Sequence, residues 1–443
     1  MIKILNRNIS SFQVIIFGFA SVILAGSLLL TLPVSTIDRQ GASFADALFT
    51  ATSAVCVTGL VIHDTATYWS AFGQAVIISL IQIGGMGVVT VAAAISMLAG
   101  RRIGLMQRST MQESLAAPQV GGIVRLTGFI LKTTFIIELA GAAVMAPVFC
   151  REFGVGKGIW YAVFHSVSAF CNAGFDLMGV RGKFSSLTSF AADPVINLAI
   201  MGLIVSGGIG FLTWYDIRTK KFRLREYRMQ SKAILTVTAL LILLPALGFF
   251  FLEFAGLPTG ERIWCSLFQS VTPRTAGFNT ADLTKLSDSG AALTIILMLI
   301  GGSPGSTAGG MKTTTLAVII AAAAAVFRRR SDAHFFGRRI SADTVRSAAA
   351  IMLMYLVLFM AGGMAISRVE GIALLDCLFE TASAIGTVGL SMGITPGLSL
   401  ASRGILVFLM FFGRVGGLTL IFAAVSGDRN FAAKLPQERI TVG

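Results

Sequence analysis

The chain has 443 residues, of which 55% are hydrophobic and only 13% charged, whereas a water-soluble domain carries about 25% charged residues. This composition excludes an ordinary soluble domain, but it does not distinguish a channel, a carrier and a membrane enzyme. The net charge of +14 does not indicate nucleic-acid binding, because the basic residues form clusters that each follow a long apolar segment.

Long and short apolar segments follow one another in an order that occurs four times. The first long run, Phe12–Leu32, can cross a bilayer and lacks a signal-peptide ending, so we interpret it as a transmembrane helix. A short segment, Phe44–Val55, and a second long run, Ser70–Ala99, follow it. The later copies are Val124–Phe149, Ile159–Phe170 and Phe190–Tyr215, then Ala233–Phe254, Ile263–Thr272 and Ala291–Phe327, then Ser347–Ile366, Ala373–Ala384 and Gly404–Val425.

Short apolar segments of about ten to fourteen residues are typical of re-entrant helices rather than spanning ones. We therefore predict an all-α polytopic membrane protein with four M1–P–M2 repeats, each a spanning helix, a re-entrant pore helix and a second spanning helix. The repeats cover residues 1–100, 101–217, 218–330 and 331–443. Two crossings return the chain to its starting side, so four parallel repeats predict a pseudo-fourfold arrangement around a central pore.

The basic clusters predict the orientation in the cell (inner) membrane. Besides the N-terminus, they lie at Arg101–Arg125, Arg218–Lys232, Arg328–Arg346 and Arg429–Arg439. Because positively charged connections stay in the cytoplasm, we expect these clusters and both termini on that side.

The four short segments align with one another, at Phe49–Leu60, Phe164–Phe175, Phe268–Phe278 and Phe379–Leu390. Each begins with Phe, continues through small hydroxyl residues and ends in Gly followed by Leu or Phe. Phe and Gly lie ten residues apart in three copies and nine apart in the third. A single match could be only a tight turn, but four matches in equivalent places indicate a shared function.

These glycines suit the dehydration of a K⁺ ion, which must replace its water shell with rings of backbone carbonyls. Successive carbonyls face one pathway only with backbone angles that glycine tolerates best, and the negative end of each short helix favours a cation. We therefore assign a selectivity filter to four triplets: Val57, Thr58 and Gly59; Asn172, Ala173 and Gly174; Thr275, Ala276 and Gly277; Thr387, Val388 and Gly389.

The long run Ala291–Phe327 predicts a gate. As one helix it would measure about 55 Å, against an apolar thickness of about 30 Å. Five glycines and a proline within ten residues disfavour a continuous helix, and irregular backbone at membrane depth is tolerated where it lines a cavity. We assign an intramembrane gating loop to Gly301, Gly302, Ser303, Pro304, Gly305, Ser306, Thr307, Ala308, Gly309, Gly310 and the segment's end at Lys312.

Lys312 and Arg414 each lie in an otherwise apolar span, at a cost of about 2.5–3.5 kcal/mol. A cation below a K⁺ filter would oppose conduction, so we add both residues to the gate. The alternative is that Lys312 reaches the membrane surface and that Arg414 braces helices through carbonyl contacts.

At these residues the chain resembles the Trk/Ktr/HKT superfamily of K⁺ transporters, which fold four M1–P–M2 units into one chain. The resemblance covers essentially the whole chain and is closest to the Ktr membrane subunit, since Trk-type subunits usually add two leading helices. The one glycine that the family carries in each filter falls on Gly59, Gly174, Gly277 and Gly389. Sodium-preferring plant relatives have serine at the first position, so the resemblance implies K⁺ passage. It also implies that an intramembrane loop and an arginine on the last helix form the inner barrier.

The resemblance further implies a homodimer and a separate cytosolic regulatory subunit of the RCK type (KtrA-like), which binds ATP and ADP. It places dimer contacts near the C-terminus, here Phe431–Gly443. The loops Arg218–Lys232 and Arg328–Arg346 offer docking surfaces, although fixing the topology and meeting anionic lipid is their main expected role. No bound cofactor or metal is expected beyond the transported K⁺, with Na⁺ as a candidate activator.

The main alternative function is a secondary K⁺ symporter coupled to Na⁺ or H⁺, which sequence alone does not separate from a channel. An enzyme is disfavoured, because the chain shows no paired catalytic carboxylates, no nucleophile with a base and no cluster of metal ligands. The roles of Arg274, beside the third filter, and of Glu138, which could meet Lys132 or a neighbouring helix, stay open.

Overall fold

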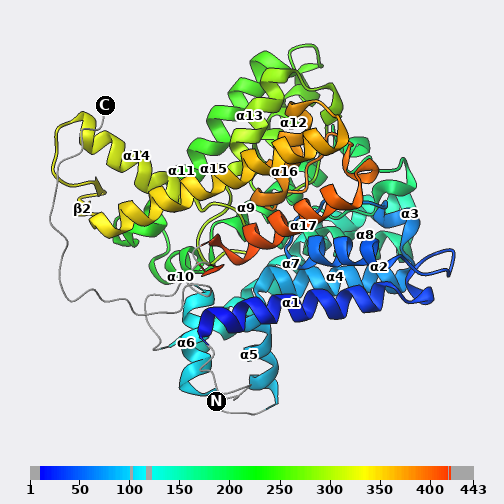
Figure 1. The fold of residues 1–443 in the computed structure, drawn as a ribbon, viewed down its shortest axis with the longest axis horizontal. Helices are drawn as coiled ribbons and strands as arrows, with labels where there is room; N and C mark the ends of the chain where they lie inside the picture. Colours follow the sequence, from blue (N-terminus) through cyan, green and yellow to red (C-terminus); the bar gives the residue numbers. More distant parts are fainter. Residues whose placement is uncertain (1–9, 100–102, 116–121, 418, 421–443) are drawn as a thin grey trace.

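The computed structural model describes residues 10–99, 103–115, 122–417 and 419–420, which form an almost entirely helical bundle (Figure 1). Within these ranges the only strands, β1 (His334–Phe335) and β2 (Arg338–Arg339), pair as a short antiparallel hairpin. The fold class predicted from the sequence is confirmed: this is an all-α, multi-pass membrane protein with re-entrant and bent helices.

The order of long, short and further helices predicted from the sequence recurs along the chain. The first group is α1 (Ser11–Leu30), α2 (Phe44–Val55), α3 (Thr65–Tyr68), α4 (Ala71–Met86), α5 (Val88–Leu98) and α6 (Leu105–Ser114). The second is α7 (Ile123–Phe153), α8 (Val155–Phe170), α9 (Pro194–Gly208) and α10 (Phe211–Lys220). The third is α11 (Met229–Gly248) with a π-helical end (Phe249–Glu253), α12 (Thr259–Val271), α13 (Asp288–Leu299) and α14 (Thr313–Phe327). The fourth is α15 (Ala342–Glu370), α16 (Leu374–Gly386) and α17 (Leu400–Val415).

Many of these helices begin where the sequence places a serine or aspartate before an apolar run. Such a side chain accepts a hydrogen bond from a backbone N–H of the first turn, which otherwise has no partner in the helix. Serine caps α1, α2, α4, α13, α15 and α17 in this way, through Ser10, Ser43, Ser70, Ser287, Ser341 and Ser399. Asp193 caps α9, with Pro194 at its first position.

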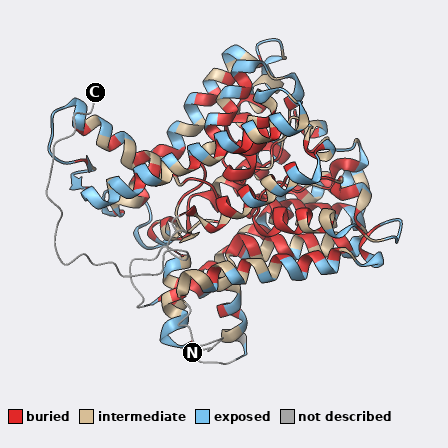
Figure 2. Cartoon of the chain, in the orientation of Figure 1, coloured by how far each residue is buried: buried red, intermediate tan, exposed pale blue. Residues whose placement is uncertain are grey.

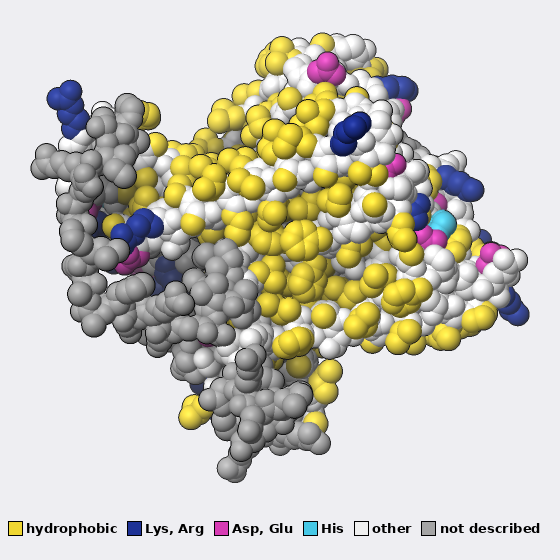
Figure 3. Space-filling view, in the orientation of Figure 1, with side chains coloured by type: hydrophobic (Ala, Val, Ile, Leu, Met, Phe, Trp, Pro, Cys, Tyr) yellow, Lys and Arg dark blue, Asp and Glu magenta, His cyan; other side chains and the backbone are white. Residues whose placement is uncertain are grey.

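Among the described residues, four helices are long and apolar enough to cross a membrane, namely Ser11–Leu30, Ile123–Phe153, Met229–Glu253 and Ala342–Glu370. Two bent pairs bring the number to six if each pair counts as one span. Hydrophobic side chains cover the middle of the face shown in Figure 3, while charged ones gather toward its two ends. This belt is the surface expected of a protein surrounded by lipid.

The second spans of the first two repeats correct the sequence prediction. Ser70–Ala99 and Phe190–Tyr215 were each expected to form a second span, but α4 and α5 meet at 96° and α9 and α10 at 97°. Each bend lies at a glycine with left-handed backbone, Gly87 at φ +86° and Gly210 at φ +89°. Residues with side chains rarely adopt that conformation, so glycine allows the chain to turn there.

The second helix of a repeat also packs against the short helix of the next repeat. Contacts join α4 to α8, α9 to α12, α13 to α16, and α17 to α2. The last of these returns to the first repeat, so the contacts close into a ring. Figure 2 shows that the buried residues gather in the interior of the bundle that this ring forms.

Candidate functional site

A glycine follows each of the four short helices, and the same backbone conformation occurs at all four places. The residue two positions before each glycine and the glycine itself both have positive φ. The values are +51° and +95° at Val57 and Gly59, +58° and +70° at Asn172 and Gly174, +65° and +78° at Thr275 and Gly277, and +52° and +95° at Thr387 and Gly389. Four separate segments thus share a conformation that is uncommon for residues with side chains.

The four glycines lie together as a closed set, which we call the glycine ring (Gly59, Gly174, Gly277 and Gly389). A Cβ atom built on each of them would collide with the carbonyl oxygen that precedes the next glycine of the ring. The distances are 2.5 Å from Gly59 to Ala173, 2.8 Å from Gly174 to Ala276, 2.3 Å from Gly277 to Val388 and 2.2 Å from Gly389 to Thr58. The structure therefore brings together all four predicted triplets.

Hydroxyl groups on the short helices hold the segments that carry the ring. In each repeat the fourth residue after the aligned Phe is serine or threonine: Ser53, Ser168, Thr272 and Ser383. Ser53 and Ser383 accept hydrogen bonds from the backbone N–H of Gly59 and Gly389, both at 3.0 Å. The hydroxyls of Ser168 and Thr272 instead donate to the carbonyl of the residue after the glycine. We did not assign these residues from the sequence, although their constant spacing carried the signal.

In the second and fourth repeats, the residue after the aligned Phe supports the outer end of its segment. Glu380 accepts hydrogen bonds from Ser391 Oγ at 2.6 Å, Thr395 Oγ1 at 2.6 Å and the backbone N–H of Met392 at 3.0 Å. In the second repeat, His165 Nε2 accepts from the backbone N–H of Leu177 at 3.3 Å. The buried histidine near the ring thus has a structural partner, and no group of metal ligands occurs among the described residues.

The segment 301–312, which we call the inner loop, lies beside the glycine ring. A Cβ on Gly309 would be 2.2 Å from Thr387 Oγ1. The Thr307 hydroxyl donates to Phe170 O at 2.9 Å and lies 3.2 Å from Asn172 Oδ1. The loop is therefore in direct contact with residues of the second and fourth triplets.

Backbone hydrogen bonds fix the inner loop between neighbouring helices. The N–H of Ser303 donates to Gly208 O at 2.9 Å, and that of Gly310 donates to Gly413 O at 3.1 Å. The loop closes on itself through Gly301 N and Met311 O at 2.7 Å. The irregular backbone thus finds its partners inside the protein, as a membrane requires.

Two cations lie against this loop. Lys312 Nζ donates to the carbonyls of Ala308 at 2.9 Å and Gly309 at 3.2 Å. Arg414 donates to Thr307 O of the loop and to the carbonyls of Gly84 and Gly85 on α4. Neither cation has a carboxylate within ion-pair distance among the described residues. Arg414 therefore does brace helices through carbonyls, as one reading of the sequence held, and it does so at the inner loop.

The two residues whose roles the sequence left open have neighbours in other helices. Arg274 is 4% exposed, and its Nη2 donates to Thr238 Oγ1 of α11 at 3.2 Å, so it packs behind the third segment. Glu138 accepts from Gln82 Nε2 of α4 at 3.2 Å. It thus meets a neighbouring helix, which was one of the two partners that the sequence suggested.

On the other side of the ring lies a cavity of about 390 Å³, lined by the four glycines and by Asp64, Asp176 and Asp282. Asp176 lies in the connection that follows the second triplet. Burial, with a smaller contribution from Asp64, raises the pKa of its carboxyl to about 7. Hydrogen bonds from Thr284 lower the pKa of Asp282 from its ordinary value. The cavity therefore joins an acidic mouth to a ring of backbone carbonyls, an arrangement suited to cations.

Comparison with known proteins agrees with this geometry. The TrkH family of cation transport proteins matches residues 7–433. The chain is 39% identical to the potassium/sodium uptake protein NtpJ of Enterococcus hirae, over 100% of this chain and 99% of that protein. It is 39% identical to the Ktr system potassium uptake protein B of Bacillus subtilis, over 94% of each chain. The crystal structure of the potassium transporter TrkH from Vibrio parahaemolyticus has the same fold, with a TM-score of 0.76 and 19% identity over 96% of this chain and 86% of that one.

The resemblance inferred from the glycine segments is thus confirmed over the full length of the chain. The family match identifies a transport protein rather than an enzyme. The glycine ring, the acidic cavity beside it and the apolar outer surface agree with that class. The chain is a member of the TrkH family of cation transport proteins.

Proposed function

We propose that this chain is a potassium-translocating membrane subunit that conducts K⁺ through the glycine ring. The observation that carries the proposal is the closed contact of four glycines with the carbonyls of neighbouring repeats. Such a ring can replace the water shell of K⁺ without side chains. The uptake of potassium named for the relatives in Enterococcus hirae and Bacillus subtilis supports the same ion.

Sodium enters the proposal as an activator or a coupled ion, because one relative is named a potassium/sodium uptake protein. Coupled K⁺ symport is the second candidate function. A gated pore would show a current that reverses at the K⁺ equilibrium potential, whereas a symporter would reverse at a potential that shifts with the Na⁺ or H⁺ gradient.

We propose that the inner loop, with Lys312 and Arg414, is the gate, within a third repeat at residues 218–330. The loop touches the second and fourth triplets, and both cations lie on it without a carboxylate partner among the described residues. A positive charge close below a carbonyl ring raises the energy of a passing cation. We place this side of the ring, and both termini, in the cytoplasm. The basic clusters belong to this side, and positively charged connections stay in the cytoplasm.

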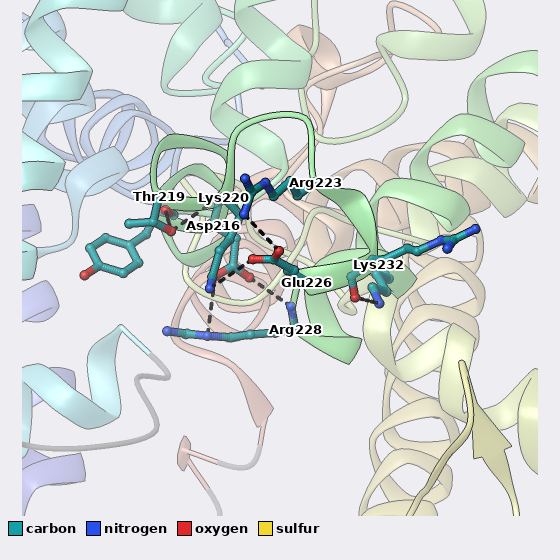
Figure 4. A network of polar contacts seen from close by, with 9 residues as sticks. Asp216, Thr219, Lys220, Arg223, Glu226, Arg228 and Lys232 are labelled. Atoms are coloured by element: carbon teal, nitrogen blue, oxygen red, sulfur yellow. Dashed lines mark hydrogen bonds and ion pairs between the residues drawn. The ribbon is translucent and has the colours of Figure 1, made fainter.

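We propose that the gate responds to a cytosolic RCK-type subunit that binds ATP or ADP, docked on a homodimer of this chain. The loop between α10 and α11 offers a docking surface whose conformation is fixed by hydrogen bonds. The buried Asp216 accepts from Ser231 Oγ at 2.7 Å and from the backbone N–H of Arg228 (Figure 4). Arg223 remains 78% exposed beside Glu226. The expected dimer segment, Phe431–Gly443, lies outside the described residues.

Replacing Gly59 with serine tests the ring. A Cβ there would meet Ala173 O at 2.5 Å in a left-handed backbone, so the carbonyls must move. We expect K⁺ preference over Na⁺ to fall by about tenfold, as for a change of about 1.4 kcal/mol, in competition uptake assays with proteoliposomes. Gly202→Ser is the control, because its Cβ would meet no atom within 4 Å. Unchanged selectivity in a folded Gly59→Ser protein would place the filter elsewhere.

Three variants test the gate. Partial deletion of Ser303–Gly309 should raise flux in the absence of a partner by about tenfold, and so should Arg414→Ala, as for about 1.4 kcal/mol off the barrier. Arg414→Lys keeps the positive charge but loses the guanidinium that reaches both α4 and the loop. It therefore distinguishes electrostatic repulsion of K⁺ from the hydrogen bonds that hold the loop against α4. Arg368→Ala, at an exposed arginine of α15, is the control. Wild-type flux in both the deletion and the alanine variant would exclude this gate.

The outer cavity gives a pH dependence. Because the pKa of Asp176 is raised to about 7, its carboxylate is charged above that pH and loses its charge below it. Acidifying the outside through neutral pH should therefore raise the KM for K⁺ about twofold, the effect of one charge at about 8 Å in water. Asp176→Asn should abolish this dependence. Asp282→Asn should keep it, because Asp282 has a lowered pKa and stays charged. A KM that does not vary with pH in the wild type would contradict the assignment.

Mass measurement tests the assembly. The chain is purified in mild detergent, alone and with a soluble RCK-type subunit, and its flux is compared in ATP and ADP. We expect a dimer of this chain that binds the soluble subunit and changes its flux with the nucleotide. A monomer whose flux ignores both would contradict the assembly, without affecting the assignment of the ring.

A further inference from the structure

We propose that the cavity between α11, α14 and α15 binds an anionic phospholipid whose acyl chain contacts the inner loop and holds it in place. The inference rests on the proposed gate and adds a ligand that regulates it. The cavity has a volume of about 630 Å³, and its lining includes Phe335 and Arg339. Both residues belong to the hairpin β1–β2, which lies at one end of the molecule (Figure 1).

The interior of this cavity is apolar, while its rim is polar. Ala233 of α11, Ala317 and Val318 of α14, and Ala348 and Ile351 of α15 line the interior. The rim carries Arg339, Ser341, Thr344 and Ser347. An amphiphile matches both parts, because a hydrocarbon chain covers the apolar walls and a charged headgroup stays at the rim.

The rim has the chemistry of an anion site. It contains the N-terminal end of α15, a helix of 29 residues, where the helix dipole favours negative charge, although Ser341 already accepts from the N–H of Thr344 and Asp343 lies in the first turn. Arg339 stands beside this end, and its ion pair with Asp332 is long, at 3.5 Å, and exposed. The surrounding segment 328–346 has six arginines and two aspartates, a net charge of +4. A phosphodiester therefore finds both a cation and a helix end.

A second observation comes from inside the cavity. Thr315 also lines it, is only 8% exposed, and its hydroxyl makes no hydrogen bond with another described residue. Its oxygen is open to the cavity, so the ester oxygens of a phospholipid there can accept a hydrogen bond from it. A free phosphate at the rim would leave this hydroxyl and the apolar walls without a partner, so the geometry favours the complete lipid.

The cavity reaches the inner loop directly. Pro304 of the loop forms part of its wall, together with Thr314 and Thr315, which follow Lys312 at the start of α14. The opposite side of this turn is fixed as well, because Phe211 N of α10 donates to Gly305 O at 2.7 Å. A lipid in the cavity would confine the Pro304 turn between itself and α10. We therefore expect occupancy to keep the loop against the ring and to lower resting flux.

Native mass spectrometry of the detergent-purified protein, titrated with phosphatidylglycerol, measures the binding. Arg339→Gln should weaken it about fivefold, the effect of one arginine near a charged lipid surface. Arg338→Gln removes the neighbouring arginine, which does not line the cavity, and should leave binding unchanged. Ala348→Leu fills the interior and should also reduce binding, whereas Ala349→Leu, at an exposed position, should not. Equal binding by each variant and its matched control would overturn the site.

Flux in liposomes of phosphatidylcholine, with or without phosphatidylglycerol, tests the coupling to the gate. Phosphatidylglycerol should lower resting K⁺ flux in the wild type and in Ala349→Leu, but not in Ala348→Leu. Loss of lipid binding without a change in flux would overturn the regulatory role, and displacement of the lipid by inorganic phosphate would show that a free anion suffices. A wild type that binds the lipid in the cavity but carries no K⁺ would instead count against the proposed function.

Discussion

The structure depends on a constraint of size: no side chain fits at the centre of the glycine ring. A Cβ on any of the four glycines would lie 2.2 to 2.8 Å from a backbone oxygen of the next repeat. Four backbones can approach this closely only if each turns through a left-handed glycine. The hydroxyls of the short helices, the ring of contacts between repeats and the acidic mouth all surround this point of closest approach. The rest of the fold holds the four short segments around this point.

The same constraint acts a second time, where the second spans pass the ends of the short helices. A Cβ on Gly84, Gly207 or Gly413 would lie 2.0, 1.9 or 2.1 Å from the carbonyl oxygen of Val55, Phe170 or Ile385. In these three repeats, glycine thus lets the second span touch the last turn of its own short helix. Three residues later, at 87, 210 and 416, another glycine turns left-handed and the helix ends or bends. Contact and turn therefore lie within a single helical turn of one another in these three repeats.

Sequence reasoning reached the ring because the signal was repeated. The pattern of Phe, hydroxyl residues and glycine occurs four times. It predicted the fold class, and it identified the four triplets that the structure places side by side. It missed the bends at Gly87 and Gly210, because a span of sufficient length and hydropathy looks continuous when only its apolar content is considered. Comparing the two repeats would have shown these bends, because both carry the same glycine pattern, G-G-M-G at residues 84–87 and G-G-I-G at residues 207–210. It also could not place the partners of Arg414 and Glu138, since those partners are backbone atoms and side chains distant in the chain.

The repeats differ at one shared position, and this difference decides what lies beside the glycine ring at that level. After the contact glycine, the first and second repeats carry a second glycine, Gly85 and Gly208, and simply bend. In the third repeat the chain leaves the helix here and forms the inner loop. In the fourth, Arg414 occupies this position, and its guanidinium binds the Gly84 and Gly85 carbonyls and the loop. The guanidinium presents a rigid, planar fork of N–H donors, which here reaches α4 and the inner loop at once. The four repeats therefore surround a space below the ring. The first and second repeats place only glycine at this position, whereas the third contributes the inner loop and the fourth contributes Arg414.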